Sequence, residues 1–460
     1  MKKIISLILS ILLVLLTFVG CGTNETSSTE TSEETVVTSN ETSKVSSKKK
    51  TSSKKKTSSK NTKSSSQKQT VTSEETTLTE KEKIYNGMDP NMYSIALKNQ
   101  GNSARIAELI KKAQAGGSYK IAVLGGSISM GAKASKTQLS YGNLVCEWWK
   151  AKFPNSNFKF INAGFGSTNP EMACYRMEED LLKYNPDFVV VDFSVNTHLD
   201  YDIYNTYSTI LYRILNQRNA PAVISIDFTN CVREKYEGYP KKIVKRPEGI
   251  SSEITDAVID YDIPALSYHN YVWKKIEEKA IEWDDVSGDY IHPDDNGHLL
   301  AKNLITAHLE EVLNNLDKYS GPITPPQTPE YTKYLNLGYI INTAQGVTMS
   351  GGFKLRSNGL ADGKGWEYAV NGTPSALTVP VPDNKKAVVF MKFINNAEGS
   401  ISVTDSNNNT YTINTHDASK RPTIGTPTLV EIGQMSGAVT FTPELTKGGF
   451  QIYGIGFEKN

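Results

Sequence analysis

Cysteine is scarce in this sequence, with four residues in 460. One of them, Cys21, follows an N-terminal apolar run, and the others are Cys146, Cys174 and Cys231. Three cysteines cannot make a full disulfide framework, and their spacings match no zinc site. Cys146 and Cys174 fall in helical apolar patterns, so we expect buried thiols, and one disulfide among the three is left open.

Long apolar runs are also missing, apart from one at the N-terminus. Residues 4–19 are almost unbroken apolar sequence between the basic start MKK and the pair Gly20-Cys21. This run is shorter than the ~20 apolar residues that a membrane span needs, so it predicts an export signal. Gly20-Cys21 resembles a bacterial lipoprotein cleavage site. The resemblance implies a signal peptide at 1–21 and a lipidated Cys21 that anchors the protein to the cell membrane outside the cytoplasm. An ordinary signal peptide cleaved nearby is the alternative.

Net charge is close to zero, because 50 Lys and Arg residues oppose 49 Asp and Glu residues, which gives +1. From this balance we expect no nucleic-acid partner. The charge is nevertheless uneven, since residues 22–83 are mostly Ser, Thr, Lys and Glu, with the repeat SSKKKTSSKKKTSSK at 46–60. Such sequence has too little apolar surface to offset the entropy of ordering, so it predicts a disordered linker. The linker serves as a spacer, or its lysines bind anionic lipid or wall polymer.

Residues 84–320 alternate between strand-like and helical patterns. Four short runs are apolar on both faces and predict buried strands: KIAVLGG (120–126), FKFINAG (158–164), PDFVVVDFSV (186–195) and PAVISIDF (221–228). Four segments repeat apolar residues at helical spacing: ARIAELIKKAQA (104–115), YGNLVCEWWKAKF (141–153), EMACYRMEEDLLKY (171–184) and GHLLAKNLITAHLEEVLNNL (297–316). Strands and helices in alternation predict an α/β domain, in which helices cover both faces of a parallel sheet.

A second domain follows a proline-rich break. The segment SGPITPPQTPE (320–330) marks the boundary, and we place a linker at 321–333. Residues 334–460 contain only short strand-like runs between turn residues, which predict an all-β sandwich. This accessory domain either binds carbohydrate, with Trp366 and Tyr368 as stacking residues, or packs against the first domain.

Polar residues gather where the predicted strands end. Ser127 follows the first strand, Gly166 the second and Asn196 the third, while Asp289 and His292 precede the last helix. In a parallel sheet the carboxyl ends of the strands form the ligand-binding edge. A hydroxyl, an imidazole and a carboxylate, with hydrogen-bond donors nearby, are what acyl transfer through a serine requires.

These segments resemble the four blocks of the SGNH (GDSL-type) hydrolase superfamily. GGSISMG resembles the first block and implies that Ser127 is the nucleophile, while DYIHP matches the D-x-x-H-P block and implies that Asp289 and His292 are acid and base. The order and spacing of the blocks fit from about residue 100 to 315. The resemblance implies a flavodoxin-like sheet and catalysis without a metal or cofactor.

The two remaining blocks, NAGFGST and SVN, imply donors for the oxyanion of the reaction. The glycine of the first is Gly166 or Gly164, of which we favour Gly166, and the second supplies Asn196. The sequence departs from the family at Gly126, where aspartate is usual, and at Thr197-His198, which replaces the aspartate that commonly follows the asparagine.

Other polar residues near the blocks have simpler interpretations. Asp294 and Asp295 are expected to cap the last helix, and His298 is expected to be structural rather than a metal ligand. His198 remains open between a substrate contact and no role.

We therefore expect a cell-surface serine esterase that hydrolyses O-acyl esters, O-acetyl above all, on an extracellular polysaccharide through an acyl-enzyme. A small ester is the other substrate class. An O-acyltransferase on a surface glycan would use the same triad. A catalytically inactive glycan-binding lipoprotein is the alternative from another class, and the retention of all three triad residues argues against it.

Overall fold

The computed structural model describes residues 78–197, 202–229, 231–234, 242–245, 251–357, 363–415 and 426–460. The predicted signal peptide, Cys21 and nearly all of the predicted linker therefore lie outside the described residues. The first described helix, α2 (Glu80–Tyr85), begins four residues before the predicted domain start at 84. It begins there because Thr79 and Glu82 form a capping box, in which each side chain accepts a hydrogen bond from the other residue's backbone N–H.

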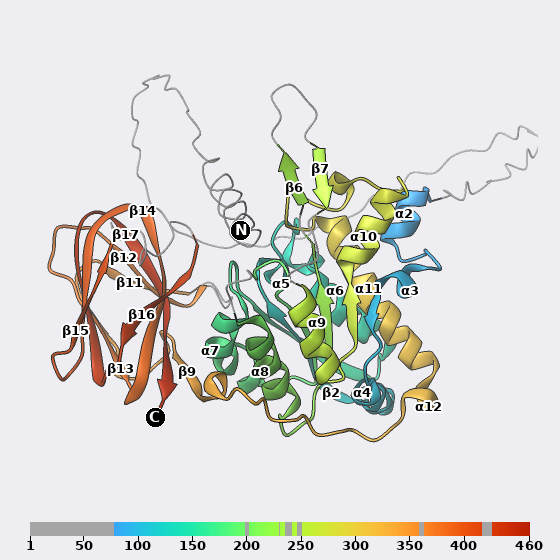
Figure 1. Ribbon diagram of the computed structural model, residues 1–460, viewed down its shortest axis with the longest axis horizontal. Coiled ribbons are helices and arrows are strands. Elements are labelled where there is room, and N and C mark those ends of the chain that lie inside the picture. Colours follow the sequence, from blue (N-terminus) through green and yellow to red (C-terminus); the bar gives the residue numbers. More distant parts are fainter. Residues whose placement is uncertain are drawn as a thin grey trace, which may run out of the picture. The chain divides into compact units, whose positions relative to one another are not determined.

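A six-stranded sheet forms the centre of the first domain, in the order β1-β8-β5-β4-β2-β3 (Figure 1). Its strands are β1 (Leu97–Asn99), β2 (Gly117–Gly125), β3 (Ser156–Gly164), β4 (Phe188–Asp192), β5 (Ala222–Asp227) and β8 (Ala265–Ser267). All neighbours are parallel except the edge pair β1 and β8. Without β1, the order is the 2-1-3-4-5 arrangement of flavodoxin-like folds, so the predicted fold class is confirmed.

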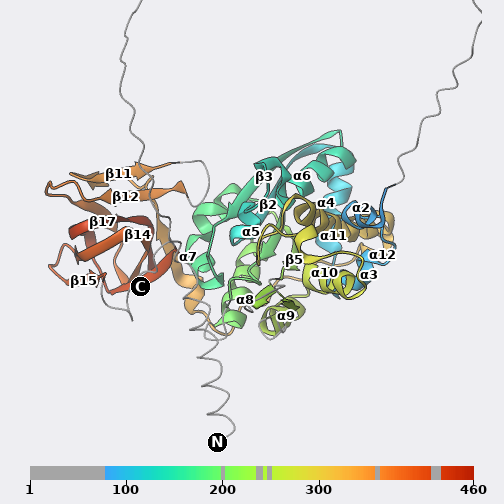
Figure 2. The ribbon, with the colours of Figure 1, turned by 90° about the horizontal axis from the view of Figure 1, so that it is seen from above.

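Helices cover both faces of this sheet (Figure 2). On one face lie α3 (Met92–Ala96), α4 (Ala104–Ala115), α6 (Tyr141–Lys152), α10 (Tyr268–Glu277) and α11 (Asp295–Asn314). On the other lie α7 (Pro170–Asp180), α8 (Ile203–Leu215) and α9 (Ser251–Asp260). Successive strand residues point to opposite faces, so Val190 joins the first core and Val191 the second. No helix among the described residues is long and apolar enough to cross a membrane.

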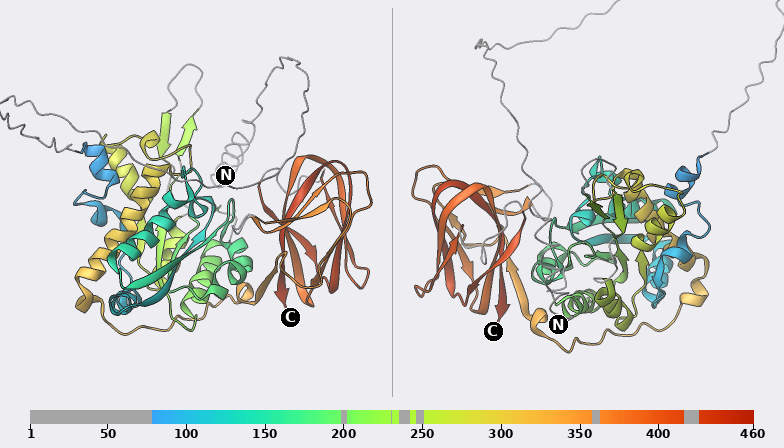
Figure 3. Two further views of the ribbon diagram at one scale, coloured as in Figure 1. Left: turned by 180° about the vertical axis from the view of Figure 1, so that it is seen from behind. Right: turned by 45° about the horizontal axis from the view of Figure 1, so that its top comes forward.

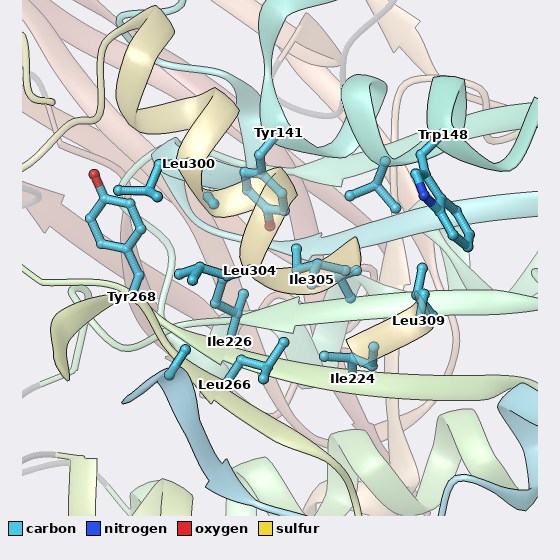
Figure 4. Close-up of a cluster of buried hydrophobic side chains, with 14 of the residues drawn as sticks. Tyr141, Trp148, Ile224, Ile226, Leu266, Tyr268, Leu300, Leu304, Ile305 and Leu309 are labelled. Carbon is cyan, nitrogen blue, oxygen red and sulfur yellow. The ribbon is translucent and has the colours of Figure 1, made fainter. Parts of the chain in front are cut away.

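The core on the α11 face shows why the strands read as apolar. Ile224, Ile226 and Leu266 of the sheet pack beneath Leu304 and Ile305 of α11, and all of these side chains are buried (Figure 4). Burying each such side chain stabilises the fold by about 1.5–3 kcal/mol. This buried core therefore supports the carboxyl edge of the sheet, where the polar residues lie.

The predicted helices at 104–115, 141–153, 171–184 and 297–316 all exist; the first has its predicted bounds, and the ends of the others are shifted by at most four residues. Helices α8, α9 and α10 and strands β1 and β8 were not predicted. Helix α11 begins at Asp295 because Asp294 caps it, accepting a hydrogen bond from Gly297 N–H at 3.0 Å. Asp295 lies in the first turn and instead accepts hydrogen bonds from the backbone N–H and hydroxyl of Ser135.

The second domain is antiparallel throughout its described part (Figure 3). Its strands are β9 (Leu337–Ile340), β10 (Thr348–Met349), β11 (Phe353–Arg356), β12 (Gly365–Ala369), β13 (Leu377–Val381), β14 (Asn384–Thr404), β15 (Thr410–Asn414), β16 (Thr428–Gly433) and β17 (Gly437–Lys459). The two long strands, β14 and β17, pair with each other and run through both layers of a sandwich. One end of β14 pairs with β16 and the other with β15. Between them Asn395 and Asn396 adopt left-handed conformations where the pairing register shifts, which lets the strand change layers.

Two expectations about side chains are settled here. Trp366 is 0% exposed and Tyr368 is 4% exposed, and both belong to the core of the β domain. Neither ring offers a face to a sugar, so the suggested stacking role was wrong. Cys146 and Cys174 are buried, as expected, Cys231 is also buried, and no disulfide joins the three.

Candidate active site

Strand β2 ends at Gly125, and a single helical turn, α5 (Ser127–Met130), begins two residues later. The turn lies so close to its neighbours that larger residues would collide. A Cβ on Gly125 would strike the Ser129 side chain, and one on Gly164 of β3 would strike the backbone of Met130. The glycines therefore allow Ser127 to stand at the carboxyl edge of the sheet.

Ser127, His292 and Asp289 lie in series at this edge. His292 Nε2 is 2.9 Å from Ser127 Oγ, and its Nδ1 is 2.8 Å from Asp289 Oδ2. The imidazole and carboxylate are partly exposed, at 23% and 26% of their side-chain surfaces. Ser127 and His292 are 165 positions apart in sequence (292 − 127), yet Oγ and Nε2 are within hydrogen-bond distance.

The loop of Asp289 and His292 is fixed by its own hydrogen bonds. Asp289 Oδ1 accepts from the backbone N–H groups of Ile291 and His292, both at 2.7 Å. Burial raises the pKa of Asp289, but these N–H groups and the imidazole outweigh burial, and the net pKa lies below its usual value. The carboxyl is thus held ionised beside the histidine. Ser287 Oγ donates to the carbonyl oxygens of Asp289 and His292, and Trp283 Nε1 to that of Asp289.

Three groups could donate hydrogen bonds to an oxyanion beside Ser127. Ser127 is the first residue of α5, so its N–H has no partner within the helix. A Cβ built on Gly166 would lie 4.0 Å from Ser127 Cβ, whereas Gly164 is packed beneath the backbone of α5. Gly166 is therefore the glycine that faces the serine. Asn196 is the third: a Cβ on Gly126 would collide with Asn196 Oδ1, which places the amide directly beside the nucleophile turn.

The same contact gives a physical reason for glycine at position 126, where the GDSL pattern has aspartate. Any side chain there would displace Asn196. The turn that carries Asn196 has its own support, since Ser194 N–H and Oγ both donate to Asp192 Oδ1 and Thr197 Oγ1 donates to Ser194 O. Thr197 is thus buried structure rather than a group facing solvent. His198 lies outside the described residues.

Asp192 is a buried acid beneath the site. Burial raises its pKa to about 7, against the opposing hydrogen bonds from Ser194 and Ser129. Ser129 Oγ is also 2.6 Å from Tyr141 Oη. This hydrogen-bonded group connects the turn after β2 with the turn after β4, and sequence reasoning did not single it out.

Lys133 and Tyr290 were also not predicted. Lys133 Nζ lies 3.9 Å from Asp289 Oδ2 and its side chain is half exposed. Tyr290, between the acid and base in sequence, is 55% exposed. Its carbonyl accepts from Cys231 N–H at 2.9 Å, where the hairpin of β6 (Cys231–Glu234) and β7 (Lys242–Lys245) begins. This hairpin thus starts beside the loop that carries Asp289 and His292.

His298 has a structural role, as predicted. Its Nδ1 accepts from Tyr141 N–H, its Nε2 lies 3.1 Å from Ala132 O, and burial lowers its pKa to about 4. Among the described residues no group of three or more His, Cys, Asp or Glu side chains could hold a metal ion.

Comparison with known proteins bears on the fold. No protein-family model matches the chain, and no curated protein matches it. Among solved structures, it is similar to a two-domain esterase active on acetylated mannans, co-crystallised with mannopentaose. That likeness has a TM-score of 0.59 and 23% identity over 80% of this chain and 98% of that one. A second structure of such a two-domain esterase gives a TM-score of 0.57 and 24% identity over the same shares. The two-domain fold is thus shared with these esterases.

Proposed function

We propose that the protein is a serine esterase that removes O-acetyl groups from an extracellular polysaccharide. The observation that carries the proposal is the hydrogen-bonded series from Ser127 Oγ through His292 to Asp289. A serine hydroxyl becomes a nucleophile when an imidazole takes its proton and a carboxylate stabilises the resulting imidazolium. The roles of nucleophile, base and acid follow from this order.

In the proposed reaction, Ser127 Oγ attacks the acetyl carbonyl as its proton passes to His292 Nε2. The negative charge that develops on the carbonyl oxygen is stabilised by the N–H groups of Ser127 and Gly166 and by the amide of Asn196. His292 then returns the proton to the departing sugar hydroxyl. Water, deprotonated by His292, releases acetate from the serine and restores the free hydroxyl.

Two observations favour a carbohydrate ester over a lipid ester. The shared fold is that of esterases that act on acetylated mannans. Tyr290 lies between Asp289 and His292 in sequence and is exposed, and an amphipathic ring of this kind can pack against the apolar face of a sugar. Release of acetate from acetylated mannan and xylan should therefore exceed hydrolysis of long-chain lipid esters.

The test uses the chain from residue 78 onward and the same chain with Ser127→Ala. A serine-directed phosphonate should label Ser127, and the alanine variant should lose activity by orders of magnitude. Labelling of another serine, or full activity of the variant, contradicts the mechanism. Faster turnover of long-chain lipid esters, with no acetate from any glycan, contradicts the substrate while leaving the mechanism intact.

We propose further that a lipid on Cys21 anchors the enzyme outside the cytoplasmic membrane, with 22–77 as a tether. A tethered enzyme can act on polymer that does not diffuse to it. Cys21→Ala should release the protein from the membrane fraction or leave its precursor uncleaved. An unmodified N-terminus at another position, found by mass spectrometry, would rule the anchor out.

A further inference from the structure

The N–H of Gly166 belongs to the peptide unit that joins it to Phe165. A peptide unit is planar, and its C=O and N–H point in opposite directions, so whatever fixes the Phe165 carbonyl also aims the Gly166 N–H. The Thr168 hydroxyl, 0% exposed, donates to Phe165 O at 2.8 Å. On its other side, Phe165 N–H donates to Gly125 O at 3.0 Å. Phe165 N–H belongs to the preceding peptide unit, so the two bonds fix the peptide units on both sides of the Phe165 Cα.

Arg176 on α7 orients this arrangement from beneath. Its guanidinium is fully buried and donates to Thr168 Oγ1 at 3.2 Å, which leaves the hydroxyl proton for Phe165 O. The same group donates to Gly125 O at 2.9 Å and to Ala163 O at 2.8 Å, the carboxyl ends of β2 and β3. A planar group with fixed donors is suited to holding several carbonyls at once. One side chain therefore connects the strand that precedes Ser127 with the loop that carries Gly166.

The β domain supplies the rest of the support. The Phe165 ring packs against Phe390, with centroids 5.2 Å apart, and edge-on against Tyr453 at 5.0 Å. All three rings are buried in one apolar cluster with Met172 of α7. The Arg176 guanidinium covers the Phe165 ring at 5.4 Å.

An ionic contact runs parallel to this ring contact. Asp180 pairs with Arg176 at 3.1 Å and accepts Lys364 Nζ from the β domain at 3.1 Å. Both ring and ion contacts from the second domain thus converge on residues that hold the glycine loop.

We propose that Thr168 and Arg176, together with Phe390 and Tyr453 of the β domain, which pack on the Phe165 ring, are positioning residues that aim the Gly166 N–H at the oxyanion. None of the four is expected to touch substrate. The inference rests on the proposed serine mechanism. Under this proposal, contacts from the β domain affect kcat for every ester, including small esters that contain no sugar.

The first experiment isolates the Thr168 hydroxyl in the full chain, with nitrophenyl acetate as a small substrate. Thr168→Val keeps the shape and removes the donor, so kcat should fall about tenfold with little change in KM, because the oxyanion donor is misaimed rather than lost. Thr168→Ser should restore kcat. The control is Thr209→Val, which removes a hydroxyl that is equally buried and donates to Asn205 O at 2.8 Å, but within α8.

Two further readouts separate positioning from general damage. The rate of phosphonate inactivation should fall with kcat, because the adduct places an oxygen in the same donor site. The midpoint of the pH–rate profile should not move, because His292 and Asp289 are untouched. Equal losses in Thr168→Val and Thr209→Val, or an unchanged kcat in Thr168→Val, would overturn the proposal.

The second experiment tests the β domain. Phe390→Leu removes the ring against Phe165, and the control Phe450→Leu removes a buried ring of the same domain that contacts Phe353 and Tyr368 instead. Lower kcat in the first only, at a temperature where both remain folded, supports the proposal, and equal kcat values overturn it. Tyr453→Leu gives the same comparison should Phe390→Leu fail to fold. A wild-type chain that is inactive, or labelled elsewhere than at Ser127, would instead overturn the proposed function.

Discussion

The position of the Asn196 amide depends on the absence of a side chain at Gly126. The amide lies beside the nucleophile turn because Gly126 has no side chain there. The segment SVN therefore places an amide beside the turn that carries Ser127, even though the aspartates of the GDSL pattern are absent at positions 126 and 197. At position 126, glycine in place of aspartate leaves room for the Asn196 amide. At position 197, threonine in place of aspartate donates a hydrogen bond from its hydroxyl to Ser194 O.

From this placement we expect Asn196→Ala to lower kcat by roughly a hundredfold, or about 3 kcal/mol, with a smaller effect on KM. The reason is that an oxyanion donor acts on charge that develops only in the transition state. Steady-state kinetics with nitrophenyl acetate measures both constants. A change confined to KM would instead make Asn196 a substrate contact.

For Tyr290 we predict a change in KM rather than in kcat. Tyr290 is exposed and lies between Asp289 and His292 in sequence, so Tyr290→Ala should raise KM for acetylated polysaccharide several-fold, consistent with a loss of about 1 kcal/mol of ring contact. Hydrolysis of nitrophenyl acetate should stay within twofold of wild type. Tyr331→Ala removes another exposed tyrosine and is the control, since Tyr331 packs against Tyr334 near the interdomain linker. A KM that is equal in both variants is the contrary result.

At the scale of elements, the contact between α5 and β3 governs the position of Ser127. Backbone approaches backbone there, because Gly164 carries no Cβ that would strike Met130. Gly164→Ala should therefore displace the turn that carries Ser127, lowering kcat at least tenfold and the free energy of unfolding by about 1–3 kcal/mol. Gly321→Ala, at a glycine with open space around it, should change neither. Kinetics and denaturant unfolding of both variants check this, and a wild-type kcat in Gly164→Ala would show that the turn adapts.

The helices and strands that could be predicted are those whose apolar residues follow a regular pattern. Helix α4 was predicted with its observed bounds, Ala104–Ala115, since its apolar spacing is regular and Gly116 and Gly117 follow it. Strands β2 to β5 were found because both their faces are apolar, which follows from helices on both sides. Strands β1 and β8 have three residues each and carry too little pattern. Residues 384–404 form one long strand, β14, where the sequence predicts short runs, because the bend at Asn395 and Asn396 has the sequence signature of a turn.

The site was partly predictable for a different reason. The residues placed at strand ends lie together because topology alone brings those ends to one edge. Thr168 and Arg176 were missed although Thr168 lies inside the quoted glycine block, because their role depends on hydrogen bonds to backbone carbonyls, which leave no pattern in side-chain type. The stacking role for Trp366 failed because an aromatic in a strand reads the same whether it faces the core or solvent.

At the scale of the whole molecule, buried titratable groups set how stability depends on pH. His298 and His308 are buried, and burial lowers the pKa of each from 6.5 to about 4. His308 lies 3.0 Å from Tyr93 Oη and 2.9 Å from Ser103 Oγ, so it joins the N-terminal segment to α11. A histidine whose folded-state pKa is depressed stabilises the fold above its unfolded pKa, and this contribution is lost as the pH falls.

Asp192 has the opposite sign. Its folded-state pKa, raised by burial to about 7 from 3.8, favours the protonated acid. Its contribution is complete at low pH and is lost as the pH rises from about 4 to 7. Between pH 4 and 6.5 the two kinds of group therefore oppose each other, and single variants are needed to separate them.

We accordingly expect the free energy of unfolding of His308→Gln to approach that of wild type as the pH falls from 6.5 to 4. Lowering the pKa of His308 from 6.5 to about 4 corresponds to at most about 3 kcal/mol of folding free energy. All of this contribution is lost at low pH. Asp192→Asn should show the reverse, with its advantage over wild type growing as the pH rises from 4 to 7. Urea unfolding at several pH values measures both differences. A gap between wild type and His308→Gln that stays constant with pH would mean that His308 contributes packing and hydrogen bonds alone, because only a pKa difference between the folded and unfolded states makes the gap change with pH.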